Sequence, residues 1–118
     1  MTLETITRKL REKAACTIQA EKRYKRYIKR SHFVVAAGIT SKGNLLICTV
    51  SKPAQKPKQL VAHAEGMIML RYGKKIDTIY IAKFNRDMSS IAIQPCALCA
   101  AYAQKLGVKI KPLEVSMT

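Results

Sequence analysis

The sequence has no long apolar run. Its longest uninterrupted apolar stretch is the eight residues Cys96–Ala103, far below the roughly 18 that a membrane-spanning helix needs. The first ten residues also lack an apolar block followed by a small-residue cleavage site, so we expect no secretory signal peptide. At 48% apolar residues, the 118-residue chain can bury one core, which disfavours disorder and a disulfide-stapled miniprotein. We therefore expect a soluble cytoplasmic protein whose four cysteines are metal ligands or core residues.

Acidic residues are scarce as well. Seven Asp and Glu stand against 22 Lys and Arg, giving a formal charge of +15 at pH 7. Self-repulsion of this size is costly to a compact chain, so we expect a polyanionic partner. The densest basic stretch is Lys22–Arg30, where aromatic rings can stack on bases while cations neutralise phosphates. The alternative is a solvated helix face with the tyrosines turned to the core. The candidate nucleic-acid contacts are Arg23, Tyr24, Arg26, Tyr27 and Arg30.

Hydrophobic periodicity predicts a single α/β domain over residues 1–118. Apolar residues from Leu3 to Ile18 recur at steps of three and four, which predicts an amphipathic helix, basic towards its end, over about 3–28. Two β-branched-rich runs around Ser41-Lys-Gly are typical of an antiparallel hairpin. The order of elements predicts a mixed central sheet of about five strands with helices packed on it, without fixing the strand order. Beyond the first helix, the expected elements are strands 33–40 and 44–50, a loop 51–60, a helix 61–72 closed by Gly73, a strand 77–83, a return segment 89–94, a helix 96–106 closed by Gly107 and a strand 108–115.

Two short strings stand at the starts of the two later helices. One is His63-Ala-Glu65 and the other is Pro95-Cys-Ala-Leu-Cys99. Cys96 and Cys99 are three apart, so their thiolates can project from one helix face and bind one ion. His63 and Glu65 are two apart and can approach the same ion only at a helix start. Two helix N-termini facing the ion would favour thiolate over thiol.

The ligand set predicts a catalytic zinc site. Three protein ligands, His63, Cys96 and Cys99, leave a fourth tetrahedral position open for water. One Zn²⁺ per chain would lower the pKa of that water to roughly 7, and Glu65 is placed to take the proton and return it. The alternatives are that the two cysteines form half of a structural zinc site and that the histidine is an ordinary satisfied side chain. A structural site has no use for Glu65, which favours catalysis.

Taken together, the strings match the H-x-E…P-C-x-x-C signature of zinc deaminases. From the hairpin at Phe33 to the last strand, the chain resembles the cytidine deaminase-like superfamily. The stretch Ser31-His-Phe-Val-Val-Ala-Ala-Gly resembles the first strand of small cytidine deaminases, which implies that Phe33 lies near the base. The resemblance also implies that Ala64, Gln94 and Pro95 line the pocket, because backbone groups at these places contact the base edge in the family.

Departures from the family pattern bear on the substrate. Where nucleoside deaminases carry an Asn-x-Glu-Asn stretch for the ribose, this chain has Ser51-Lys-Pro-Ala. Ser51 also lies where the tRNA-adenosine type has a base-contacting Asn, so it is a substrate-contact candidate. Ala97 and Ala100 replace the usual Gly and Arg around the second cysteine. A first-ligand His is commoner in the deoxycytidylate, tRNA-adenosine and polynucleotide enzymes.

We therefore expect zinc-dependent deamination of cytosine within single-stranded DNA or RNA. The first alternative is a free cytidine or deoxycytidylate deaminase, which shares the chemistry and differs in the size of the substrate. The second is a non-enzymatic nucleic-acid-binding protein with a structural zinc. Small relatives commonly assemble so that neighbouring subunits complete the pocket, so the resemblance also implies a homo-oligomer. The short apolar runs lead us to expect no membrane partner.

Overall fold

The computed structural model describes residues 1–24, 32–51 and 63–114, without the side chains of 21–24. One sheet forms the centre, in the order β2-β1-β3-β4, and β5 also pairs with β3. β1 is antiparallel to β2 and β3, β3 is antiparallel to β4, and β3 is parallel to β5. The predicted class, a mixed five-stranded sheet with packed helices, is confirmed. The elements are α1 (Leu3–Tyr24), β1 (His32–Thr40), β2 (Leu45–Val50), α2 (Ala64–Tyr72), the 3₁₀ turn η2 (Gly73–Lys75), β3 (Ile76–Asn85), β4 (Ser90–Ile91), α3 (Ala97–Leu106) and β5 (Lys109–Pro112).

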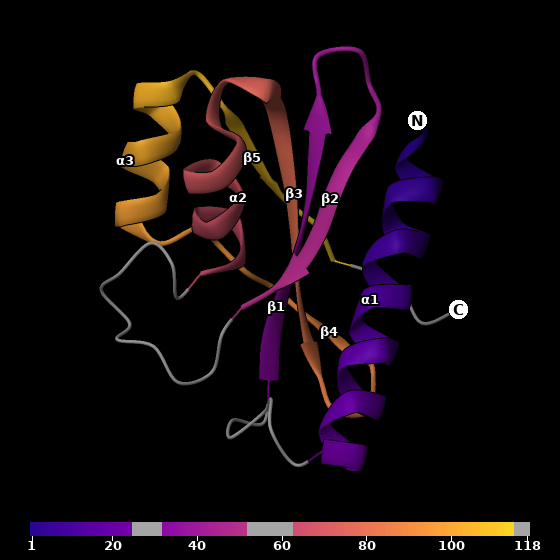
Figure 1. Cartoon of the computed structure of the whole chain (residues 1–118). Helices are drawn as coiled ribbons and strands as arrows, with labels where there is room; N and C mark the ends of the chain where they lie inside the picture. The colour runs from indigo at the N-terminus through magenta and orange to yellow at the C-terminus, as the bar shows by residue number, and fades with distance from the viewer. Residues whose placement is uncertain (25–31, 52–62, 115–118) are drawn as a thin grey trace.

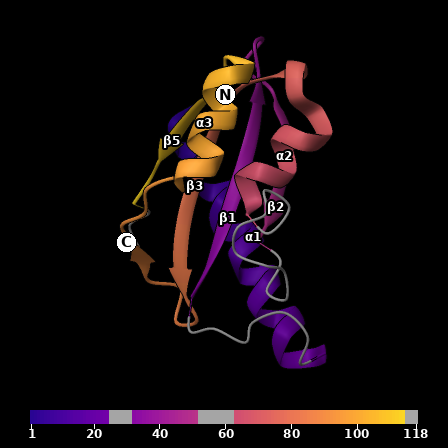
Figure 2. The ribbon, with the colours of Figure 1, turned by 90° about the vertical axis from the view of Figure 1, so that its left-hand side faces the viewer.

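The molecule has three layers, with α1 on one face of the sheet and α2 and α3 on the other (Figures 1 and 2). Side chains of a strand alternate between the two faces, so the central strands feed two separate core clusters. On the α1 side, Val35 and Ala37 of β1 pack with Leu10 of α1. On the other side, Ala36 of β1 and Ile81 of β3 join the core under α2 and α3. Both faces of the central strands are therefore buried.

The first helix buries one apolar stripe, as its periodicity predicts. Its start is fixed by Thr2, whose Oγ1 accepts a hydrogen bond from Thr5 N at 3.2 Å, satisfying one of the free amides of the first turn. The outer face is charged and includes an exposed Arg8–Glu12 pair at 3.9 Å. Within the described ranges, no helix is long and apolar enough to cross a membrane. The buried stripe consists of Ile6, Leu10, Ala14 and Ile18.

Gly38 allows α2 to approach β1 closely. A Cβ added there would lie 2.9 Å from Ile68 Cγ2 and 2.9 Å from Ile76 Cδ1, a separation that carbon atoms cannot hold without displacement. This contact sets the position of α2 along β1. Ile68 lies over Gly38, and the helix begins four residues before Ile68. The start of α2 therefore lies over the first half of β1, at the level of Ala36.

Several predicted boundaries differ from the structure. The first helix is described to Tyr24, and the predicted continuation to 28 lies outside the described residues. α2 begins at Ala64, with His63 as its N-cap. The strand predicted over 77–83 runs from Ile76 to Asn85, whereas β5 covers Lys109–Pro112 and residue 115 of its predicted range lies outside the described residues. Beyond Pro112 the Leu113 amide still donates to Ile81 O at 2.8 Å, and proline is tolerated in β5 because this strand lies at an edge of the sheet.

Candidate metal centre

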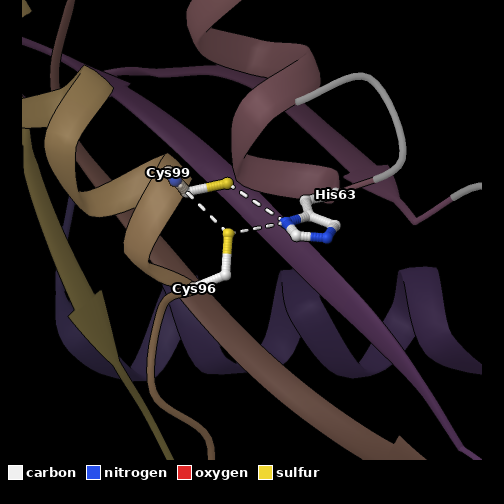
Figure 3. A group of neighbouring side chains, drawn as sticks. All are labelled: His63, Cys96 and Cys99. Carbon is white, nitrogen blue, oxygen red and sulfur yellow. Dashed lines mark hydrogen bonds between the residues drawn. The ribbon is translucent and has the colours of Figure 1, made fainter. Parts of the chain in front are cut away.

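The N-termini of α2 and α3 carry the three candidate ligands (Figure 3). His63 is the N-cap of α2 and has extended backbone angles, φ −104° and ψ 139°. Cys96 is the N-cap of α3, also extended, with φ −66° and ψ 156°. Cys99 follows in the first turn of α3, and its amide donates to Cys96 Sγ at 3.3 Å. The expected arrangement, with both cysteines on one helix face, is corrected here: Cys96 precedes the helix and faces its free amides.

The three ligand atoms meet in a compact group. His63 Nδ1 lies 2.9 Å from Cys96 Sγ and 3.2 Å from Cys99 Sγ, and one donor atom of each residue lies within 4.8 Å of the others. The nitrogen that faces the sulfurs is Nδ1, and Nε2 lies on the far side of the ring from them (Figure 3). The structure thus brings together the three residues that the sequence nominated as zinc ligands.

The chemistry of this donor set fits Zn²⁺. Zn–S bonds of about 2.3 Å and Zn–N bonds of about 2.0 Å at tetrahedral angles require N···S separations of about 3.5 Å, so the group needs to open by less than about 1 Å. Burial raises the pKa of the Cys99 thiol well above its usual range, and the neighbouring Glu65 carboxylate raises it further. A divalent cation reverses this balance, because it stabilises the thiolate directly.

Glu65 is a buried acid beside these ligands. Its side chain is 5% exposed, and Oε1 lies 3.8 Å from His63 Nδ1. The second oxygen, Oε2, is buried and has no hydrogen-bond partner among the described residues. A buried polar atom without a partner costs free energy, so a fold that only needed stability would not keep this carboxylate here. The arrangement places a carboxyl group next to the candidate cation site.

Four predicted substrate contacts lie next to the ligands or at the end of β2. Ala64 is fully buried directly after His63. Pro95 is half-buried and Gln94 is exposed, both immediately before Cys96. Ser51 follows β2, and its Oγ accepts a hydrogen bond from Val34 N at 3.3 Å. Their contact with a substrate stays a prediction.

The placement of Phe33 corrects the expectation drawn from the family resemblance. Phe33 is 5% exposed and belongs to the core cluster that packs against α1. Its ring stacks on Phe84, with centroids 6.1 Å apart. Since the ligands lie on the face covered by α2 and α3, Phe33 points to the opposite side of the sheet. It is a core residue and not a contact for the base.

The predicted nucleic-acid contacts are not placed by the structure. Arg26, Tyr27 and Arg30 lie outside the described residues. Arg23 and Tyr24 belong to the last turn of α1, but their side chains are not among those described. Their contact with a nucleic acid stays a prediction.

Lys83 shares the metal-side face; from the sequence it could be a contact for a substrate strand in the loop after the third strand, with a simple turn as the preferred interpretation, and the structure places it inside β3. Lys83 is half-buried in β3 and pairs directly with Val34 of β1, and Val34 packs against the core under α2 and α3. Directly opposed residues of an antiparallel pair share a face. The signal was present in the sequence, because Lys83 continues the period-two series of Ile79 and Ile81.

Comparisons with known proteins give a distant structural likeness. No protein-family model matches the chain, and no curated protein matches it. Among solved structures, the crystal structure of cytidine deaminase from Mycobacterium leprae matches with a TM-score of 0.45 and 21% sequence identity, over 82% of this chain and 82% of that chain. The case for a function is therefore made from the residues of the site.

Proposed function

We propose that this protein is a zinc-dependent hydrolase that deaminates cytosine to uracil, with single-stranded DNA or RNA as its substrate. One observation carries the proposal. His63 Nδ1 and the sulfurs of Cys96 and Cys99 converge at two helix N-termini, next to the buried Glu65 oxygen that has no partner among the described residues.

Each residue has a distinct task in this proposal. His63, Cys96 and Cys99 would hold Zn²⁺, which when bound supplies a water molecule whose pKa is lowered to roughly 7. Glu65 accepts a proton from the attacking water and passes it to the ring nitrogen beside the amino-bearing carbon. It then takes the second proton of that oxygen and gives it to the amino group, which leaves as ammonia. One C–O bond forms, one C–N bond breaks, and Glu65 returns to its starting state.

A structural zinc site is the main rival, and the ligand inventory disfavours it. Structural sites bind zinc with four Cys or His side chains. The whole chain has four Cys and two His, all at described positions, and three of these six form the group. Of the others, Cys16 is exposed on α1, Cys48 lies in β2 and His32 begins β1, and none of them belongs to the group. Among the described residues, the group therefore offers three such ligands.

The preference for a polynucleotide is supported by the formal charge of +15 and by the absence of the ribose-binding stretch after β2. Binding of single-stranded oligonucleotides should weaken as salt rises, with a log–log slope of about −0.7 per phosphate neutralised. Replacing Arg23, Arg26 and Arg30 with Gln should flatten that slope about equally for all base sequences, because phosphate contacts position a strand without reading it. A slope unchanged by the three substitutions would remove this stretch from the interface.

A substrate panel tests the activity. The zinc-loaded protein is incubated with cytidine, deoxycytidylate, single-stranded DNA and single-stranded RNA, and conversion of C to U and of A to inosine is followed by mass spectrometry. We expect C-to-U conversion, fastest in the single strands. Faster turnover of the free nucleotide would favour the nucleotide-pool alternative. An absence of product on every substrate, with zinc bound at one per chain, would favour the structural-zinc protein.

A further inference from the structure

We infer that Lys83 binds a phosphate group of the substrate at the open end of the metal centre, an assignment that rests on the proposed function. The inference starts from a row of residues that crosses the sheet. Lys83 of β3 is paired with Val34 of β1 on one side and with Ile91 of β4 on the other. Beyond Val34 the row continues to Ser51, whose amide donates to Val34 O at 2.9 Å.

This row lies on the metal-side face. Val34 packs against the core cluster that contains Ala64 and Cys99, and directly opposed neighbours point to the same side of a sheet. The next row inward is formed by Ala36 and Ile81, both fully buried. Burial thus decreases within one pleat period, a distance of about 7 Å along the strand.

The helices explain why burial decreases at this row. Gly38 of β1 lies under Ile68 of α2. From Ile68 back to Ala64 the helix covers about 6 Å, which is also the distance that the strand covers from Gly38 back to Ala36. The helix start therefore lies above Ala36. Continuing in the same direction, Val34 and Lys83 lie past the start of α2, on the side where His63 caps the helix. Lys83 and Val34 therefore lie on the part of the sheet surface that α2 does not cover, in front of the metal centre.

Lys83 has no carboxylate partner among the side chains that the structure describes. It forms no ion pair among the described residues, although it is half-buried. The segments 25–31, 52–62 and 115–118 contain no Asp or Glu, and Glu21, whose side chain is not described, belongs to α1 on the opposite face of the sheet. Asp87, which lies in the turn after β3, is exposed and accepts hydrogen bonds from the Ser89 amide and hydroxyl. The charge of this half-buried lysine on the metal-side face is thus available for a ligand.

The ligand chemistry that fits is a phosphate attached to the cytosine-bearing unit. A lysine binds phosphate as a point charge with three rotatable donors, and its flexible stem can extend from the strand while its methylene groups stay packed. The N-termini of α2 and α3 face the same region and also favour negative charge. The phosphate comes either from a mononucleotide or from a polynucleotide backbone, and the experiment distinguishes these sources.

The test compares Lys83→Met with Lys83→Arg and with a control, Lys75→Met. Met keeps an unbranched stem without charge, whereas Arg keeps the charge. Lys75 is exposed in η2, roughly 25 Å along β3 from Lys83. Cytidine, cytidylate and a single-stranded oligonucleotide with one cytosine are compared by kcat/KM and by equilibrium binding to the zinc-loaded protein.

We expect Lys83→Met to lower the cytidylate-to-cytidine ratio, in kcat/KM and in affinity, by roughly 10- to 100-fold, the loss of one charged hydrogen bond. Lys83→Arg should restore most of that ratio, and Lys75→Met should not change it. A loss confined to the oligonucleotide-to-cytidine ratio assigns the phosphate to the polynucleotide backbone. If Lys83→Met changes neither the cytidylate-to-cytidine ratio nor the oligonucleotide-to-cytidine ratio, the inference is overturned. Binding ratios that depend on Lys83, without turnover of any substrate, would uphold the phosphate site and refute the deaminase proposal instead.

Discussion

The ligand role of Cys99 can be separated from its role as a core residue by one substitution measured under two conditions. In Cys99→Ala, the loss of the buried sulfur affects packing whether or not zinc is present, whereas the loss of a ligand matters only with zinc. The two contributions therefore differ in their dependence on metal. Urea unfolding is followed by circular dichroism, once with excess chelator and once at a free zinc concentration about 100 times the dissociation constant of the unchanged protein.

The magnitudes follow from burial and from mass action. Cys99 is fully buried, and removal of one buried atom of methylene size costs about 1 kcal/mol. Zinc at about 100 times its dissociation constant stabilises the unchanged protein by about 2.7 kcal/mol. We therefore expect Cys99→Ala to lower the free energy of unfolding by about 1 kcal/mol in chelator and by about 4 kcal/mol in zinc.

Cys48→Ala is the matched control. Cys48 is half-buried in β2, and its thiol donates to Lys9 O at 3.8 Å, but it does not belong to the ligand group. Its free energy of unfolding should fall by about 1 kcal/mol or less under both conditions. The stabilisation that zinc adds should be unchanged. A Cys99→Ala protein that zinc stabilises as strongly as the unchanged protein would refute the ligand assignment.

Three further outcomes are expected. Glu65→Gln should retain zinc and the unfolding midpoint but lose roughly 10²- to 10⁴-fold in kcat, because an amide cannot shuttle a proton; a variant with normal turnover would contradict the role of Glu65. Gly38→Ala should lower the free energy of unfolding by roughly 1–3 kcal/mol in urea titrations, because the new Cβ overlaps Ile68; unchanged stability would mean that α2 moves freely over β1. Burial raises the pKa of Cys48 to about 11, so a thiol reagent at pH 8 should modify exposed Cys16 well before Cys48 in the zinc-loaded protein, and equal rates by peptide mapping would contradict that burial.

The convergence of the candidate metal ligands could be predicted from the sequence because their geometry is local. His63 and the two cysteines lie within short strings at helix starts, and helix capping fixes their directions within a few residues of chain. The position of Cys96 as an N-cap shows the limit of this argument. The spacing of three fits both a pair on one helix face and a cap with a first-turn partner, and only the folded backbone distinguishes them.

The error at Phe33 has a different physical cause. β1 is buried on both faces, so its sequence is apolar from Phe33 to Ile39 and lacks the polar alternation that would assign a face to each residue. A shift of one residue moves every side chain to the other side of the sheet. The long-range pairing of β1 with β3 decides the matter, and the same pairing places Lys83 in front of the metal centre.

The central claim is that the zinc-loaded protein replaces the amino group of cytosine with an oxygen atom from water. The most direct measurement incubates it with a single-stranded oligonucleotide that contains one cytosine, in water enriched in the heavy oxygen isotope, and analyses the product by mass spectrometry. We predict a uracil that carries one heavy oxygen atom, together with one ammonia released per uracil formed, and neither product from the Glu65→Gln protein. Unchanged cytosine after incubation with the zinc-loaded protein, or a uracil that carries no heavy oxygen from the solvent, would contradict the account.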